Sequence, residues 1–241
     1  MNFRVGFSTG CLYQDVPNIK DALRVIRNLG CNAVELNFIK AKDLTLETVK
    51  TLDPDDFEGF DYVSLHAPSS GVVYEMSKPT DEIFLKIHLV NDIRKLDNVV
   101  FHPDTLVHPD ILLRLGINYS LENMDKRKKD RRYPQELLPL MLCLSNAGFV
   151  FDINHALSID RVNLWMRYIN ENAGSTFGER LRHVHLSGYQ GYHDPLFKTG
   201  QRNLVEEVAK LSHVPIIIES VVGLNEIERE FQYVLDVLAE K

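Results

Sequence analysis

Seven short apolar runs of the chain each carry a histidine, an aspartate or a glutamate at or next to their end. These residues are Glu35, His66, His102, Glu122, Asp152, His185 and Glu219. Imidazole nitrogens and carboxylate oxygens together suit Zn²⁺, Mn²⁺ or Fe²⁺, whereas a calcium site is built from oxygen atoms alone. A single histidine in such a place is most often a strand residue that meets solvent, but the repetition over seven runs indicates one shared metal centre.

The candidate ligands divide into two sets by their place along the chain. The last four runs supply the residues expected to surround one ion: Glu122, Asp152, His185 and Glu219. The other candidates come from the third and fourth runs or from later loops: His66, His102, His155 and His193. We expect one to three ions, with Zn²⁺ or Mn²⁺ as the metal. His183, two residues before His185, is expected to be a satisfied core residue instead.

Residues so far apart in sequence meet only if the runs that carry them lie side by side. The eight runs are Val5–Ser8, Ala33–Leu36, Tyr62–Leu65, Val99–Phe101, Tyr119–Leu121, Phe149–Phe151, Val184–Leu186 and Ile216–Ile218. Amphipathic stretches alternate with them at about 18–29, 81–96, 109–115, 134–146, 160–172, 203–212 and 224–239, with a weak helix within 45–58. The alternation predicts a single (β/α)8 TIM barrel, in which functional groups gather at the carboxyl ends of the strands.

An open, doubly wound sheet is the alternative fold for such an alternation. It is disfavoured because Ser8-Thr9-Gly10-Cys11, after the first run, is not a glycine-rich phosphate-binding turn. With 241 residues, of which 44% are hydrophobic, we expect one barrel domain over residues 1–241. The net charge of -7 excludes a protein that is basic overall. Three cysteines without CxxC spacing, and no long apolar run, favour a cytoplasmic protein without a membrane partner.

The order of the motifs resembles the xylose-isomerase-like barrel superfamily, which includes endonuclease IV and the ketose 3-epimerases. The motifs are His-Ala-Pro at 66–68, His-Pro at 102–103, Glu-Asn at 122–123, Asp-x-x-His at 152–155, His-Leu-Ser at 185–187 and Glu-Ser at 219–220. The resemblance covers nearly the whole chain. It implies an epimerase-like site for one ion, in which Glu122 and Glu219 also exchange protons with the substrate carbon.

The endonuclease IV branch implies more ions. In that branch, the positions of His66, His102, His155 and His193 hold ligands for additional zinc ions, and Glu122 bridges two of them. Gly191 departs from the pattern, because the branch has an aspartate at this position. A third ion would therefore lack one of its usual ligands.

Two reactions fit these residues. A metal cluster suits phosphoester hydrolysis, because adjacent ions activate water and stabilise the leaving oxygen. A single ion between two carboxylates suits proton transfer next to a carbonyl group. We expect a divalent-metal-dependent phosphoester hydrolase of endonuclease IV type, with Glu122 and Glu219 as catalytic residues; the alternative is a sugar or sugar-phosphate isomerase or epimerase that uses them as its acid/base pair. A barrel that only binds a small anion is disfavoured by the intact ligand set.

A basic run from Lys126 to Arg132 follows the fifth strand and brings six cations to the expected mouth of the barrel. Such a run is either a solvated loop or an electrostatic funnel for a phosphorylated substrate. The expected substrate-binding residues are Glu35, Tyr13, Lys126, Arg127 and Lys198. The expected partner is a small anionic or sugar-like substrate. Nucleic acid is weakly supported, because the chain is acidic and lacks recognisable aromatic wedges.

Overall fold

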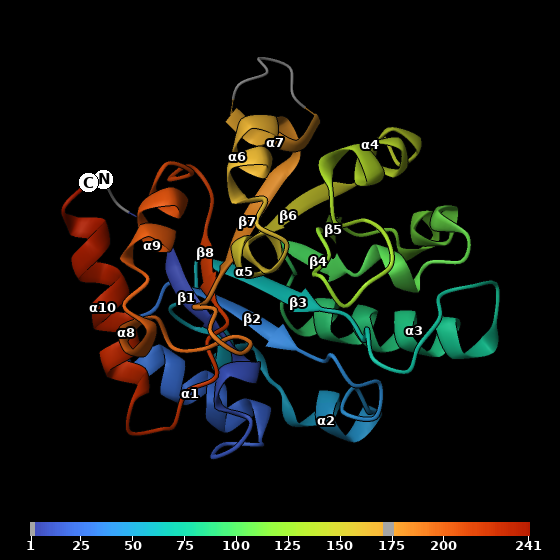
Figure 1. Ribbon diagram of the computed structural model, residues 1–241. Coiled ribbons are helices and arrows are strands. Elements are labelled where there is room, and N and C mark those ends of the chain that lie inside the picture. Colours follow the sequence, from blue (N-terminus) through green and yellow to red (C-terminus); the bar gives the residue numbers. More distant parts are fainter. Residues whose placement is uncertain (1–2, 171–175) are drawn as a thin grey trace.

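Each strand pairs in parallel with the next strand along the chain, and the last pairs with the first. The structure is a computed structural model that describes residues 3–170 and 176–241. The strands are β1 (Val5–Ser8), β2 (Ala33–Asn37), β3 (Tyr62–His66), β4 (Asn98–Phe101), β5 (Tyr119–Glu122), β6 (Gly148–Asp152), β7 (Leu181–Leu186) and β8 (Ile216–Ile218). They close into a barrel surrounded by helices (Figure 1), which confirms the predicted (β/α)8 fold.

Helices fill the connections between the strands. The α-helices are α1 (Ile19–Asn28), α2 (Leu46–Thr51), α3 (Lys78–Ile93), α4 (Pro134–Cys143), α5 (Ile153–Ser158), α6 (Val162–Asn170), α7 (Thr176–Arg180), α8 (Leu196–Thr199), α9 (Arg202–Ala209) and α10 (Ile227–Ala239). The 3₁₀ helices are η1 (Thr9–Leu12), η2 (Pro54–Phe57), η3 (Pro103–Thr105) and η4 (Pro109–Leu115). Within the described residues, none of these helices combines the length and the apolar character needed to cross a membrane.

The predicted strands agree with the structure to within one residue, except β7, which begins at Leu181 instead of Val184. The predicted helices need more correction. Residues 109–115 form the 3₁₀ helix η4 instead of an α-helix, and the weak helix within 45–58 is divided into α2 and η2. The predicted helix 160–172 is α6 as far as Asn170, and its last two residues lie outside the described residues.

The segment 152–155, predicted to be a loop, is the start of helix α5. Asp152 ends β6 and is also the N-cap of α5, because its Oδ1 accepts a hydrogen bond of 2.8 Å from the backbone N–H of His155. The strand therefore passes into the helix without a connecting loop. No apolar period of sufficient length marks so short a helix in the sequence.

Strand register brings the candidate ligands together. Asp152 on β6 lies beside His185 on β7, and Asn37 at the end of β2 lies beside His66 at the end of β3. Because parallel strands point the same way, their carboxyl ends form one rim. Side chains that are tens of residues apart in sequence meet at this rim.

The apolar core lies mainly between the strands and the helices. The Phe149 ring on β6, for example, stacks on Trp165 of α6 at 5.3 Å between centroids, and meets Phe177 of α7 edge-on at 4.8 Å. The barrel interior is partly polar, because Glu35 and His183 are fully buried inside it. Burial of such groups is costly unless they are paired, and Glu35 Oε2 lies 3.2 Å from His183 Nε2.

Strands β1 and β2 approach each other closely at Gly6. A Cβ atom at Gly6 would lie 1.5 Å from the backbone oxygen of Ala33, which cannot rotate away as a side chain would. We expect Gly6→Ala to lower the free energy of unfolding by about 3 kcal/mol or more, as measured by denaturant unfolding. Gly191→Ala is the matched control, since its Cβ would meet atoms no closer than 3.8 Å. An equal loss in both variants would contradict the steric explanation.

Candidate metal centre

The carboxylate of Glu122, at the end of β5, lies between two sets of histidines. Its Oε2 is 3.3 Å from His66 Nε2 and 3.1 Å from His102 Nε2. Its Oε1 is 3.2 Å from His185 Nδ1 and 3.3 Å from His155 Nδ1. Glu122 is only 1% exposed, so each of its oxygens faces basic nitrogens in a buried environment.

Three groups of candidate ligand atoms surround this carboxylate. In each group the ligand atoms lie within 4.8 Å of one another. The groups are His66–His102–Glu122, Glu122–Asp152–His185–Glu219 and Asp152–His155–His193. The structure thus brings all eight predicted ligands together, with Glu122 shared by two groups and Asp152 shared by two.

Hydrogen bonds outside the cluster orient two of the histidines. His66 Nδ1 lies 2.9 Å from the backbone oxygen of Ala67, and His155 Nδ1 lies 2.8 Å from that of Asn123. A carbonyl oxygen only accepts, so each Nδ1 carries a proton, and Nε2 is the nitrogen that would bind an ion once any proton of its own is released. This arrangement is typical of metal-binding histidines.

Asn123 links the ends of strands β5 and β6, which carry the ligands Glu122 and Asp152. Its side-chain oxygen accepts from the backbone N–H of Asp152 at 2.8 Å, and its side-chain nitrogen donates to the Asp152 carbonyl at 2.9 Å. Asn123 therefore fixes β6 against β5, in addition to orienting His155. Asn123 is not among the predicted site residues, although its place directly after Glu122 is a signal that could have indicated a role.

Burial and mutual charge set the protonation of the cluster. Burial raises the pKa of Asp152 to about 6 and that of Glu219 to about 7. Burial opposes the charged form of Glu122 too, but the charges of His102, His185 and His155 hold the pKa of this carboxyl well below its usual range. For His66, burial lowers the pKa, but the hydrogen bond to Glu122 and its charge raise it to about 9.

The third group is completed by Asp152 instead of a residue near His193. Gly191 offers no side chain, and Asp194 uses Oδ2 to accept from the backbone N–H groups of Gln190 and Gly191 at 2.7 and 2.6 Å. Asp194 therefore shapes the loop, and the carboxylate of the third group comes from Asp152 at the end of β6.

The loop after β7 holds His193 in an unusual backbone conformation, with φ of 50°. Its Nδ1 is 3.0 Å from Ser187 Oγ, and its ring meets the Tyr192 ring edge-on at 4.1 Å. The Arg127 guanidinium lies 3.8 Å from the centre of the Tyr192 ring, and its Nε donates to Asp125 at 2.6 Å. The basic loop thus packs on the loop that carries His193.

A cavity of about 380 Å³ opens above the cluster. Six of the predicted ligands line it: His66, His102, Glu122, His155, His193 and Glu219. Asp152 and His185 lie below them, each 1% exposed. Tyr13 and Tyr192 form part of the wall, and Tyr13 also borders a neighbouring cavity of about 470 Å³.

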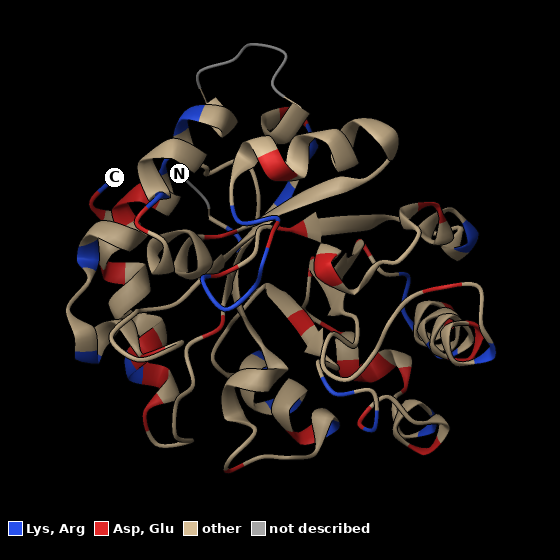
Figure 2. Cartoon of the chain, turned by 45° about the vertical axis from the view of Figure 1, so that its right-hand side comes forward, with Lys and Arg blue, Asp and Glu red and all other residues tan. Residues whose placement is uncertain are grey.

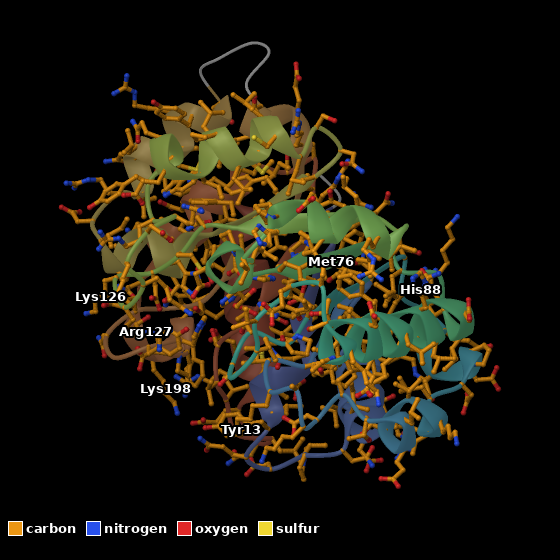
Figure 3. The ribbon with its side chains drawn as sticks, turned by 90° about the vertical axis from the view of Figure 1, so that its right-hand side faces the viewer. Tyr13, Met76, His88, Lys126, Arg127 and Lys198 are labelled. Atoms are coloured by element: carbon orange, nitrogen blue, oxygen red, sulfur yellow. The ribbon has the colours of Figure 1, made fainter. Side chains whose placement is uncertain are left out.

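Most of the predicted substrate-binding residues lie outside the lining of the cavity. Figure 3 shows Lys126, Arg127 and Lys198 at the left of the molecule, with Tyr13 below them. Of the five predicted residues only Tyr13 is among the described residues that line the cavity above the cluster. Lys198 forms an ion pair with Glu226 at 2.7 Å, and the Lys126 ammonium lies 5.4 Å from the centre of the Tyr189 ring.

Glu35 faces the barrel interior instead of the cavity. It is fully buried, its Oε2 accepts a hydrogen bond of 2.8 Å from Ser64, and it lies beside His183 and His185. The helices around the barrel carry both acidic and basic residues (Figure 2). The surface around the cluster is therefore neither uniformly acidic nor uniformly basic.

The sequence matches no protein-family model, and no curated protein resembles it significantly in sequence. Solved structures do resemble it in fold. Endonuclease IV from Thermus thermophilus covers 99% of this chain and 100% of its own, with a TM-score of 0.66 and 15% identity. A D-tagatose 3-epimerase-like protein covers 98% of both chains, with a TM-score of 0.64 and 18% identity.

A third match is the probable 3-DHS dehydratase AsbF, involved in petrobactin synthesis, from Bacillus anthracis. It covers 98% of this chain and 99% of its own, with a TM-score of 0.64 and 12% identity. The chain shares the fold of these barrels. The resemblance predicted from the motifs is confirmed at the level of the fold, and the three TM-scores are too similar to favour one reaction over another.

Metal binding should release protons, because ligands bind in their deprotonated forms. Glu219, with a pKa of about 7, and His66, with a pKa of about 9, both hold a proton at pH 6 in the metal-free protein. We expect the apparent Zn²⁺ affinity to rise at least tenfold per pH unit from pH 6 to 7. Calorimetric titration in two buffers of different ionisation enthalpy counts the released protons, and an affinity that does not change with pH would contradict the assignment.

Proposed function

We propose that this protein is a divalent-metal-dependent phosphoester hydrolase of endonuclease IV type, acting at the carboxyl-terminal mouth of the barrel. One observation carries the proposal: Glu122 presents one oxygen to His66 and His102 and the other to His185. A carboxylate with nitrogen ligands on both sides is the arrangement of a bridge between two ions. The His66–His102 pair lies outside the Glu122–Asp152–His185–Glu219 group and forms, with Glu122, a second group that could hold an ion.

The donors fit divalent ions. Asp152 Oδ2 is buried and has no hydrogen-bond partner among the described residues, which is costly for a carboxylate oxygen unless a cation satisfies it. One ion would be held by His66, His102 and Glu122, and a second by Glu122, Asp152, His185 and Glu219. Nitrogen and carboxylate ligands of this kind favour Zn²⁺ or Mn²⁺.

Such a pair of ions would supply the charge stabilisation that phosphoester cleavage needs, at both the attacking and the leaving oxygen. The chain's own residues supply the rest. Strands β3 to β8 carry ligands to one rim, and Tyr13 and Tyr192 line the cavity above them. Arg127 packs on Tyr192 beside this wall, and its guanidinium is paired with Asp125.

The substrate class is a small phosphorylated molecule. Endonuclease IV itself acts on nucleic acid, as its name states, but here several cations of the basic loop are engaged within the chain. Lys128 forms an ion pair with Asp104 at 2.6 Å, and Arg127 with Asp125. Engaged cations leave less positive charge for a long phosphate backbone.

A sugar or sugar-phosphate isomerase or epimerase is the second candidate. It is favoured by one specific observation, that Glu122 and Glu219 belong to the same ligand group as Asp152 and His185. Two carboxylates beside one ion suit proton transfer at a carbon atom. Fold similarity to a D-tagatose 3-epimerase-like protein supports this alternative as much as the hydrolase.

Metal stoichiometry separates the two candidates. We expect two or three ions per chain by elemental analysis of protein purified without chelator, and one fewer in His102→Ala, because this variant removes a ligand of only one group. His108→Ala is the matched control, since His108 is an exposed residue six positions further along the same connection. One ion per chain, unchanged in His102→Ala, would instead favour the epimerase.

The same two variants, His102→Ala and His108→Ala, should differ in phosphoesterase activity. With bis(p-nitrophenyl) phosphate as the probe, we expect His102→Ala to lower kcat/KM by about 100-fold or more, because an ion contributes several kcal/mol of transition-state stabilisation. His108→Ala should keep near-normal turnover. If the wild type and His108→Ala do not hydrolyse phosphoesters but do interconvert ketoses, the hydrolase proposal is wrong.

A further inference from the structure

A chain of buried polar groups continues from the metal centre into the barrel interior. His185 presents Nδ1 to Glu122 and Glu219, at 3.2 and 3.5 Å. Its other ring nitrogen, Nε2, points away from the cluster and lies 3.1 Å from Glu35 Oε1 and 3.0 Å from His183 Nε2. His185 therefore has one nitrogen in the cluster and the other in the interior.

The interior groups support one another. Glu35 Oε2 accepts a hydrogen bond of 2.8 Å from Ser64 Oγ and lies 3.2 Å from His183 Nε2. His183 Nδ1 lies 2.8 Å from the hydroxyl of Tyr62, near the amino-terminal end of β3. Glu35, Ser64 and His183 are all fully buried. The chain of contacts runs from His185 through Glu35 and His183 to Tyr62.

One oxygen atom in this series of buried contacts accepts no hydrogen bond among the described residues. Glu35 Oε1 is buried and has no hydrogen-bond partner among the described residues. A buried carboxylate oxygen is costly unless a donor or a cation satisfies it. An N–H on His185 Nε2 would be such a donor after a small rotation of the ring, since the two atoms are already 3.1 Å apart.

The position of this proton decides whether His185 can be a ligand. A neutral imidazole carries one proton, so a proton on Nε2 leaves the lone pair of Nδ1 free for an ion, and a proton on Nδ1 blocks it. Ligating histidines commonly donate their second N–H to a carboxylate, which fixes the tautomer and the ring orientation. Glu35 is placed on the correct side of His185 to have this effect.

We propose that Glu35, itself held by Ser64 and His183, is the positioning residue that keeps His185 in the tautomer with Nδ1 free for metal. Glu35 is not among the described residues that line the cavity above the cluster. This role replaces its predicted role in substrate binding, and it rests on the proposed function in so far as His185 is taken to be a metal ligand.

Cobalt binding tests the proposal, because Co²⁺ accepts the same ligands and its visible absorption reports their geometry. We expect Glu35→Ala to weaken Co²⁺ binding by about 10- to 100-fold and to change the absorption spectrum. Glu35→Gln should restore part of the affinity, since its amide oxygen still accepts an N–H from His185. Glu35→Leu, which fills the space but has no accepting oxygen, decides the test if Glu35→Ala does not fold, and a wild-type affinity and spectrum in Glu35→Leu would overturn the proposal.

Ser120→Ala is the matched control for a purely structural effect. Ser120 is equally buried and donates a hydrogen bond of 2.7 Å to Asn98, which belongs to none of the ligand groups found among the described residues. It should lower the melting temperature without changing Co²⁺ affinity by more than about twofold. A folded Glu35→Ala protein with wild-type Co²⁺ affinity and spectrum would overturn the proposal.

Two further outcomes separate this proposal from the others. Loss of one ion in Glu35→Ala, with unchanged affinity for the rest, would mean that Glu35, His183 and His185 themselves form a cation site, and would overturn the positioning role. His185→Ala tests the ligand set on which the proposed function rests. If this variant loses no ion, the proposed function fails irrespective of Glu35.

Discussion

The buried charge of Glu122 is the constraint on which the rest of the centre depends. A carboxylate that is 1% exposed is stable as an anion only if cations or donors surround it. Four histidine nitrogens lie within 3.3 Å of its two oxygens, and three of these histidines come from different strand ends. The closed barrel makes this arrangement possible, because it brings all eight strand ends to one rim. The four histidines thus surround and stabilise this one group.

The strands and the ligands were predictable from sequence for the same reason. A short apolar run followed by a histidine or a carboxylate shows both where a strand ends and what it presents, so His66, His102 and Glu122 are predicted by one pattern. Contacts that depend on two distant loops leave no such pattern. The packing of Arg127 on Tyr192 and the ion pair of Lys198 with Glu226 require the three-dimensional arrangement.

Glu35 shows a different limit of sequence analysis. Its place near the end of a strand was the same as that of the ligands, yet its side chain lies a layer deeper, beside His183. The relation between the two depends on strand stagger around the barrel, which no single run reveals. Helix caps are also difficult to predict from a single apolar run. Asp152 is both the last residue of strand β6 and the N-cap of helix α5.

The shared fold explains why similarity alone leaves the reaction open. An endonuclease, an epimerase-like protein and a probable dehydratase match this barrel about equally well, with identities of 12 to 18%. Barrels of this kind keep the strands and vary the residues at the rim. The reaction must therefore be argued from how the rim residues are shared among ions, and Glu122 is the residue at which the candidate reactions differ.

The double use of Asp152 links the metal centre to the secondary structure. Its Oδ1 caps helix α5 through the N–H of His155, while Oδ2 lies 3.5 Å from Nε2 of His155, another candidate ligand. A helix of six residues has little stability of its own, so its first turn depends on this carboxyl group remaining in place. Filling and emptying of the centre would thus be coupled to the order of α5, and the exchange rate of the His155 amide would act as an internal gauge of occupancy.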